Sequence, residues 1–203
     1  ILDGSGHSVL ASRRESTAAP IASITKLMTA IVVLEAGQPL DEKITLNADD
    51  VRATAGSGSR LPQGARLSRS DLLHLALMSS DNRAAHAVCR SYPKGLAACV
   101  RAMNAKAAAL DMKSARFVEP TGLSRGNVAS PRDLAKLVLA AGANPTIREF
   151  STDAEHTVQV GRGTLQFRNT NSLVDKADWH VSVQKTGYTS DAGRCLVMAA
   201  VID

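Results

Sequence analysis

The spacing of apolar residues predicts a helical middle section in this chain. Between Ser23 and Glu35 the apolar residues follow a helical period and also fill the flanks, which predicts a central buried helix that ends at Gly37. Another helix is predicted to begin at a capping Ser70, and another at Ser130, which proline follows directly. Two further helices are predicted near residues 83–91 and 95–110.

Both ends of the chain show the composition and alternation typical of β-strands. After a Gly4-Ser5-Gly6 turn, strands are predicted over residues 7–13, 156–160, 164–168, 181–186 and 194–202. Strands at the ends with helices between them predict an α+β fold, in which an antiparallel sheet from both chain ends carries an inserted, mostly helical lobe. We expect a single domain over residues 1–203, with an α/β lobe of 1–47 plus 151–203 and a helical lobe of 48–150.

Composition narrows the class of protein. The chain has 203 residues, of which 44% are hydrophobic, so it can bury a core as one domain or as two fused lobes. Aromatic residues make up only 3%, too few for base stacking, so no nucleic-acid partner is predicted. The net charge of +5 suits a substrate that bears carboxylates, although ordinary surface lysines and arginines are the better explanation of it. No apolar run is long enough to cross a membrane.

The three cysteines leave two alternatives open. Cys89 and Cys99 flank a predicted turn between two helices and can meet across it as a disulfide if the protein is exported. The alternative is a metal site that these two thiols form with His86, for which the spacing is irregular. Cys195 lies in an apolar run and is expected to be a small core residue. We predict no metal and no cofactor.

Three short motifs carry the chemistry, in the order Ser23-Ile24-Thr25-Lys26, Ser80-Asp81-Asn82 and Lys185-Thr186-Gly187. The first pattern, S-x-x-K, occurs three times in the chain and means little alone, whereas S-x-N and K-T-G each occur once. Together, in this order, they are the signature of enzymes in which serine attacks a peptide or lactam carbonyl and lysine replaces histidine as the base. A histidine triad is disfavoured because the five histidines show no partnering pattern.

Each motif residue has a predicted role. Ser23 is the nucleophile, and Lys26, one helical turn later, is its base if burial and the second cation Lys185 lower the pKa of Lys26. A capping serine and a solvated lysine would be the ordinary interpretation, but Lys26 lies on an otherwise apolar helix. Ser80 would relay a proton to the leaving amine, and Asn82 would hold the substrate backbone.

The third motif is predicted to end a strand at the edge of the cleft. Lys185 and Thr186 offer a cation and a hydroxyl to a carboxylate, and Gly187 permits close approach of an extended peptide. The backbone N–H groups of Ser23 and Tyr188 would form the oxyanion hole.

These residues resemble the serine D-alanyl-D-alanine peptidases, the low-molecular-mass penicillin-binding proteins, over essentially the whole chain. Residues 20–29 resemble the nucleophile segment of the family, and residues 77–85, 119–124 and 185–189 resemble the penicillin-binding protein 7 endopeptidase branch. The resemblance implies the β-lactamase/DD-peptidase-like fold, the site roles given above and peptidoglycan peptides as substrates. It also implies β-lactams as covalent inhibitors and a periplasmic location, the signal peptide lying outside this chain.

Three other functions remain open at this point. Relatives that act as carboxypeptidases often place an arginine shortly before the K-T-G strand, where this chain has Thr170, which favours cross-link endopeptidase over carboxypeptidase activity. A class A β-lactamase would need an E-x-x-L-N element, and the segment from Glu119 to Leu123 has a different pattern. A non-catalytic cell-wall-binding module would not need Lys26. The family fold carries another strand and helix after residue 203, so we expect a piece of a longer precursor, and the sequence makes no prediction about a membrane anchor.

Overall fold

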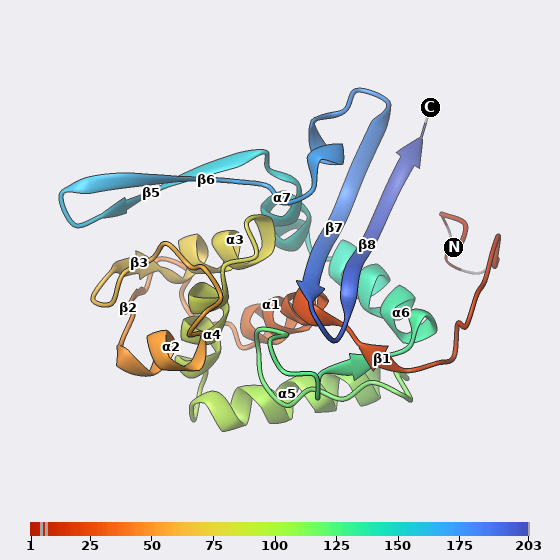
Figure 1. Cartoon of the computed structure of the whole chain (residues 1–203), viewed down its shortest axis with the longest axis horizontal. Coiled ribbons are helices and arrows are strands. Elements are labelled where there is room, and N and C mark those ends of the chain that lie inside the picture. The colour runs from red at the N-terminus through yellow and green to blue at the C-terminus, as the bar shows by residue number, and fades with distance from the viewer. Residues whose placement is uncertain (5, 7, 203) are drawn as a thin grey trace.

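The computed structural model describes residues 1–4, 6 and 8–202 and has an α+β architecture (Figure 1). The helices are α1 (Thr25–Glu35), α2 (Ala48–Ala53), α3 (Arg69–Met78), α4 (Asn82–Arg90), α5 (Leu96–Ala109), α6 (Pro131–Gly142) and α7 (Pro145–Thr152). The strands are β1 (Ala19–Pro20), β2 (Lys43–Thr45), β3 (Arg66–Ser68), β4 (Val128–Ala129), β5 (Glu155–Val160), β6 (Gly163–Arg168), β7 (Trp179–Thr189) and β8 (Gly193–Ile202). Two short 3₁₀ turns span Ala22–Ile24 and Ser172–Asp175.

Helix α1 is the centre of the core, as its apolar sequence predicts. Every residue from Thr25 to Val33 is buried, and α3, α4, α5 and α6 pack around the helix. The helix ends where predicted, because Gly37 has a φ of 65° and donates its N–H to the Leu34 carbonyl at 3.1 Å. A helix buried on all sides is held in a fixed position, which suits an element that carries reactive groups.

Within the described part of the chain, the strands pair as four separate two-stranded antiparallel sheets. The longest is the β7–β8 hairpin, which α6 and α7 cover (Figure 1). Both helices pack against β7, and most of their residues belong to the segment 48–150 that was assigned to the helical lobe. The β5–β6 hairpin forms a separate arm that packs on α3 and β3.

The predicted sheet between the two chain ends is not formed within residues 1–4, 6 and 8–202. Strands β7 and β8 pair only with each other, and the predicted strand over residues 7–13 is reduced to one bridge between Leu2 and Val9. The first residues use their backbone groups in a local turn, since Leu10 N–H donates to the Ile1 carbonyl at 2.9 Å. Ser5 and His7, which belong to the predicted turn and strand, lie outside the described residues.

Helix starts follow from capping side chains. Ser130 caps α6 with proline at the first turn, as predicted. The cap of α3 is Ser68 rather than the predicted Ser70, because Asp71 completes a reciprocal capping box with Ser68. Two short helices were missed: α2, which begins after Asn47, and α7, which begins after Asn144.

Cys89 and Cys99 form a disulfide, with a Cα–Cα distance of 5.5 Å, that ties α4 to α5. This outcome removes the alternative of a metal site with His86, because both sulfur atoms are bonded to each other. Cys195 is free and half-buried. Among the described residues, no helix combines the length and the apolar character that crossing a membrane requires.

Candidate active site

Ser23 lies in the 3₁₀ turn that leads into α1, and this turn is tightly enclosed. The preceding Ala22 is buried with a φ of 46°, an uncommon conformation for a residue with a side chain. Two glycines from distant segments close around the turn. A Cβ on Gly122 would lie 1.9 Å from the Ala22 carbonyl oxygen, and one on Gly187 would lie 2.9 Å from the Ser23 backbone nitrogen. The position of Ser23 is therefore fixed by backbone contact from both sides.

Lys26 is 1% exposed, and its amine lies against three oxygen atoms. Its Nζ is 2.7 Å from Ser23 Oγ, 2.7 Å from Asn82 Oδ1 and 2.7 Å from the Thr121 carbonyl oxygen. Burial lowers the pKa of Lys26 to about 7, against an opposing effect of the Glu119 and Asp81 charges. The geometry and the lowered pKa both suit a lysine that accepts the proton of Ser23.

The loop that supplies the Thr121 carbonyl is organised by Glu119, a residue to which the sequence analysis gave no site role. One Glu119 oxygen accepts the N–H and the hydroxyl of Thr121, both at 2.6 Å. The other accepts the N–H groups of Gly122 and Ser124 and the amide of Asn127, at 2.7, 3.3 and 2.8 Å. The buried Asn127 also donates to the Thr25 hydroxyl at 3.1 Å, which ties the loop to the start of α1.

The second motif forms the turn between α3 and α4. Ser80 has a φ of 60°, again uncommon for a residue with a side chain, and it lines a cavity together with Asn82. Asp81 caps α4 by accepting the Ala84 N–H at 2.9 Å. Asn82 is the first residue of α4, and its amide oxygen accepts from Lys26 Nζ at 2.7 Å.

The third motif lies on β7. Lys185 is fully buried and donates to the Thr186 carbonyl at 2.9 Å, and burial together with the charge of Lys26 lowers its pKa well below the ordinary value. The half-buried Thr186 shares a hydrogen bond with the Thr170 hydroxyl. Tyr188, the residue after Gly187, continues the strand with its side chain 70% exposed. Thr186 is therefore the motif side chain that β7 presents to solvent, with Lys185 beneath it.

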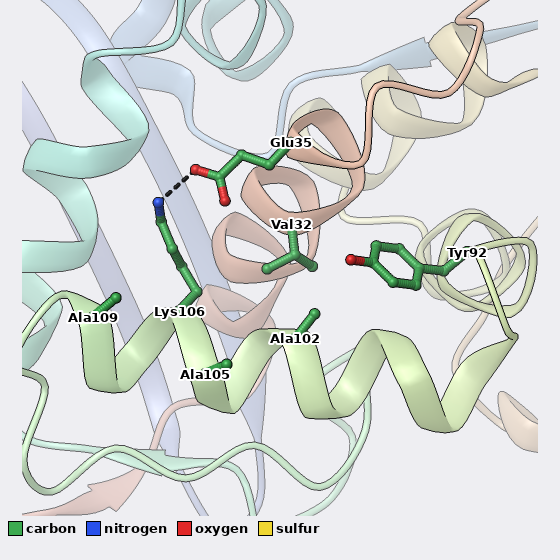
Figure 2. Close-up of a pocket in the computed structure, with 7 residues that line it drawn as sticks. All are labelled: Val32, Glu35, Tyr92, Ala102, Ala105, Lys106 and Ala109. Atoms are coloured by element: carbon green, nitrogen blue, oxygen red, sulfur yellow. Dashed lines mark hydrogen bonds and ion pairs between the residues drawn. The ribbon is translucent and has the colours of Figure 1, made fainter.

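A second cavity, of about 300 Å³, is larger than the one that Ser80 and Asn82 line. It lies between the C-terminal part of α1 and helix α5 (Figure 2). Its lining includes Val32, Tyr92, three alanines of α5, and Glu35, which pairs with Lys106. It contains no residue of the three motifs. The structure thus brings the first two motifs together at Lys26 and sets β7 against the Ser23 turn, and this larger cavity has no part in that arrangement.

The whole of residues 1–203 matches the profile of one peptidase family, described as D-alanyl-D-alanine carboxypeptidase (peptidase S11). The chain belongs to this family. It is 47% identical, over its whole length, to proteins named D-alanyl-D-alanine endopeptidase from Pseudomonas aeruginosa and from Escherichia coli K12, and it spans 66% of the length of each.

Solved structures agree with this family. A DD-transpeptidase from Streptomyces superposes with a TM-score of 0.87 at 27% identity, covering 95% of this chain and 79% of that one. A D-alanyl-D-alanine carboxypeptidase from Mycobacterium tuberculosis gives a TM-score of 0.81 at 25% identity, covering 98% of this chain and 80% of that one. The predicted β-lactamase/DD-peptidase-like fold is therefore confirmed.

Proposed function

We propose that this chain is the catalytic region of a serine D,D-peptidase that cleaves D-alanyl bonds in peptidoglycan peptides. The observation that carries the proposal is the position of the Lys26 amine, 2.7 Å from Ser23 Oγ and from two carbonyl-type oxygens. A neutral amine has two N–H groups and one lone pair. Asn82 and Thr121 accept the two N–H groups, so the lone pair is left for the proton of the Ser23 hydroxyl.

The reaction begins with this proton transfer. With a pKa of about 7, Lys26 is neutral in a large fraction of molecules near neutral pH. It takes the Ser23 proton while Oγ attacks the D-alanyl carbonyl carbon, and the N–H groups of Ser23 and Tyr188 donate to the oxyanion. The amine leaves with the proton, which returns from Lys26 through the Ser80 hydroxyl, and the acyl group stays on Ser23. Water then hydrolyses this ester.

The remaining motif residues bind the substrate. Thr186 donates its hydroxyl to the carboxylate beside the scissile bond, and this carboxylate in turn favours the protonated, positively charged form of Lys185 beneath it. Gly187 lets β7 lie close to the Ser23 turn, so that a substrate strand fits along β7. The amide of Asn82 holds the substrate backbone from the opposite side. No cofactor takes part in this scheme.

We propose cross-link endopeptidase as the main activity. The two relatives at 47% identity carry the name endopeptidase, and Thr170 presents a neutral hydroxyl beside Thr186 where carboxypeptidase relatives often carry arginine. Carboxypeptidase activity on pentapeptide stems is the second candidate, favoured by the description of the family. The substrate of the main activity is a peptide dimer joined through a D-alanyl bond.

β-Lactam turnover is disfavoured by the contacts of Glu119. A class A β-lactamase needs a glutamate that activates water for deacylation. Here the Glu119 carboxylate accepts hydrogen bonds from five groups of its own loop and of Asn127, which leaves no free position for such a water. β-Lactams are therefore proposed to acylate Ser23 and to remain bound as covalent inhibitors.

We place the protein in the periplasm, exported from the cytoplasm. The disulfide between Cys89 and Cys99 supports this location, since such bonds persist in oxidising compartments. We further propose that residues 1–203 form one peptidase domain, in which the α/β lobe and the helical lobe meet at the Ser23 turn.

The intact mass of the protein after exposure to benzylpenicillin tests the proposed function. The chain should gain the mass of one penicillin molecule, mapped to Ser23, and keep it for far longer than a β-lactamase would. Ser23→Ala is the control and should stay unmodified. No added mass in the wild-type chain would overturn the proposal, and so would labelling at Ser91 or Ser182, the serines of the two other S-x-x-K segments.

Chromatography of muropeptides after digestion of cross-linked sacculi separates the two candidate activities. Endopeptidase activity converts dimers to monomers in matching amounts. If dimers persist while monomeric pentapeptides lose D-alanine, the main activity is that of a carboxypeptidase and the endopeptidase assignment is wrong.

A further inference from the structure

A cavity of about 140 Å³ opens beside Ser80 and Asn82, between the Ser79–Asn82 turn and the loop of residues 57–60. Phe167 of β6 forms another part of its wall. Three of the residues in this wall, Ser80, Asp81 and Asn82, form the second motif, so a substrate seated on Ser23 has this cavity next to it. The loop of residues 57–60 had no place in the sequence-based interpretation.

Arg60 is the cation of this cavity wall, and it is available for binding. Its guanidinium carbon lies 4.7 Å from the centroid of the Phe167 ring, and the residue is exposed. Among the residues that the structure describes, no carboxylate lies within ion-pair distance of Arg60. A guanidinium stacked on a ring keeps its N–H edge free and loses little freedom when it binds a planar carboxylate.

The one acid in the same wall, Asp81, is already satisfied. It is 6% exposed, one oxygen accepts the Ala84 N–H at 2.9 Å, and the other accepts the Ser59 hydroxyl at 2.7 Å. Its charge is further stabilised at the N-terminus of α4. The bond from Ser59 also fastens the loop to the Ser79–Asn82 turn, so the residue next to Arg60 is fixed relative to the catalytic groups.

We propose that Arg60 is a specificity-determining residue that binds a second carboxylate of the peptide substrate, distinct from the carboxylate beside the scissile bond. The inference rests on the proposed function and names a further requirement of the same site. Cell-wall stem peptides carry such groups on their glutamyl and diaminopimelyl residues. A planar, bidentate carboxylate matches the free edge of the stacked guanidinium, whereas a carboxamide of the same shape lacks the charge and one acceptor.

The test compares hydrolysis of a cross-linked peptide dimer with that of two analogues. In one analogue the glutamyl α-carboxylate is amidated, and in the other the side-chain carboxylate of diaminopimelate is amidated. For the wild-type chain, kcat/KM should fall about fivefold for one of the analogues, the effect of a well-placed exposed ion pair. Arg60→Gln should show less than a twofold difference between that analogue and the parent dimer.

Arg162→Gln is the matched control. Arg162 is exposed at the turn of the β5–β6 hairpin, so the substitution removes the same charge away from the cavity, and this variant should discriminate as the wild type does. The proposal is overturned if Arg60→Gln and the wild type respond equally to both amidations, or if Arg162→Gln loses discrimination to the same extent. Benzylpenicillin labelling of wild-type Ser23 tests the proposed function separately, because it needs no second carboxylate in the ligand.

Discussion

Replacing Glu119 by glutamine should slow acylation of Ser23 and shift its pH dependence. Glutamine keeps one acceptor oxygen and puts an NH₂ group in place of the other. In the amide orientation that disturbs the fewest hydrogen bonds, the NH₂ group replaces the oxygen to which Thr121 donates. The Thr121 hydroxyl can then turn and accept a hydrogen bond from this NH₂ group. The Thr121 N–H is then left without an acceptor, at a cost of about 1–3 kcal/mol.

The lost hydrogen bond belongs to the loop that presents the Thr121 carbonyl to Lys26. If the loop relaxes to recover the lost bond, the lysine is no longer held toward Ser23, and the acylation rate constant should fall about tenfold to a hundredfold. The charge has a second, separable effect. The Glu119 carboxylate raises the pKa of Lys26, so its removal lowers that pKa, and the rise of the rate with pH should move to more acidic pH.

The assay follows benzylpenicillin adduct formation by intact mass over time, from about pH 5 to pH 9, where a lysine with a pKa near 7 titrates. Glu119→Asp keeps the negative charge but has a side chain too short for the same hydrogen bonds. It should therefore slow acylation with little shift in the pH dependence of the rate. Glu149→Gln, on the exposed face of α7, is the control and should behave as the wild type does. A Glu119→Gln variant with a wild-type rate and a wild-type pH profile would refute this reasoning.

Three further predictions concern the base, the nucleophile turn and the disulfide. Lys26→Arg should reduce acylation by about a hundredfold to ten-thousandfold in a chain that circular dichroism shows to be folded, because arginine cannot release its proton; near-normal acylation would exclude Lys26 as the base. Gly122→Ala should lower the unfolding free energy by about 3 kcal/mol or more, well beyond the effect of Gly64→Ala. Both glycines have a positive φ, but of the two only Gly122 has backbone atoms within 4 Å of an added Cβ. Equal losses of unfolding free energy in urea denaturation would show that this close backbone contact has no effect. Reducing the Cys89–Cys99 disulfide, which spans 10 residues, should lower the unfolding free energy by about 3 kcal/mol; an unchanged urea midpoint in the reduced protein would contradict this.

The sequence predicted the parts of the fold and site that depend on local pattern. The all-round apolar character of residues 24–34 could only suit a buried helix, and α1 is that helix. Lys26 stood out because it is a charged residue on this helix. The cap of α3 was misplaced because two serines lie close together, and Asp71 selects Ser68 through a side-chain contact that propensity alone does not reveal. Helix α2, with 6 residues, is too short to show a period.

The parts that the sequence did not predict depend on contacts between distant segments. The Thr121 carbonyl that accepts from Lys26 lies 95 residues away in the chain, and as a backbone group it leaves no trace in residue type. Glu119 could have been found as an acid in a loop that contains Pro120 and Gly122 and whose backbone N–H groups need acceptors. The predicted pairing of the two chain ends failed because alternation predicts strands but not their partners.

The dependence on pH of Ser23 acylation in the wild-type chain tests the central claim most directly. Because only neutral Lys26 can accept the Ser23 proton, the rate of benzylpenicillin adduct formation should rise with pH and reach half its maximum near the pKa of about 7. A rate that is constant over this range, or one that reaches half its maximum only near the ordinary lysine value of 10.5, would contradict a buried, neutral Lys26 as the base.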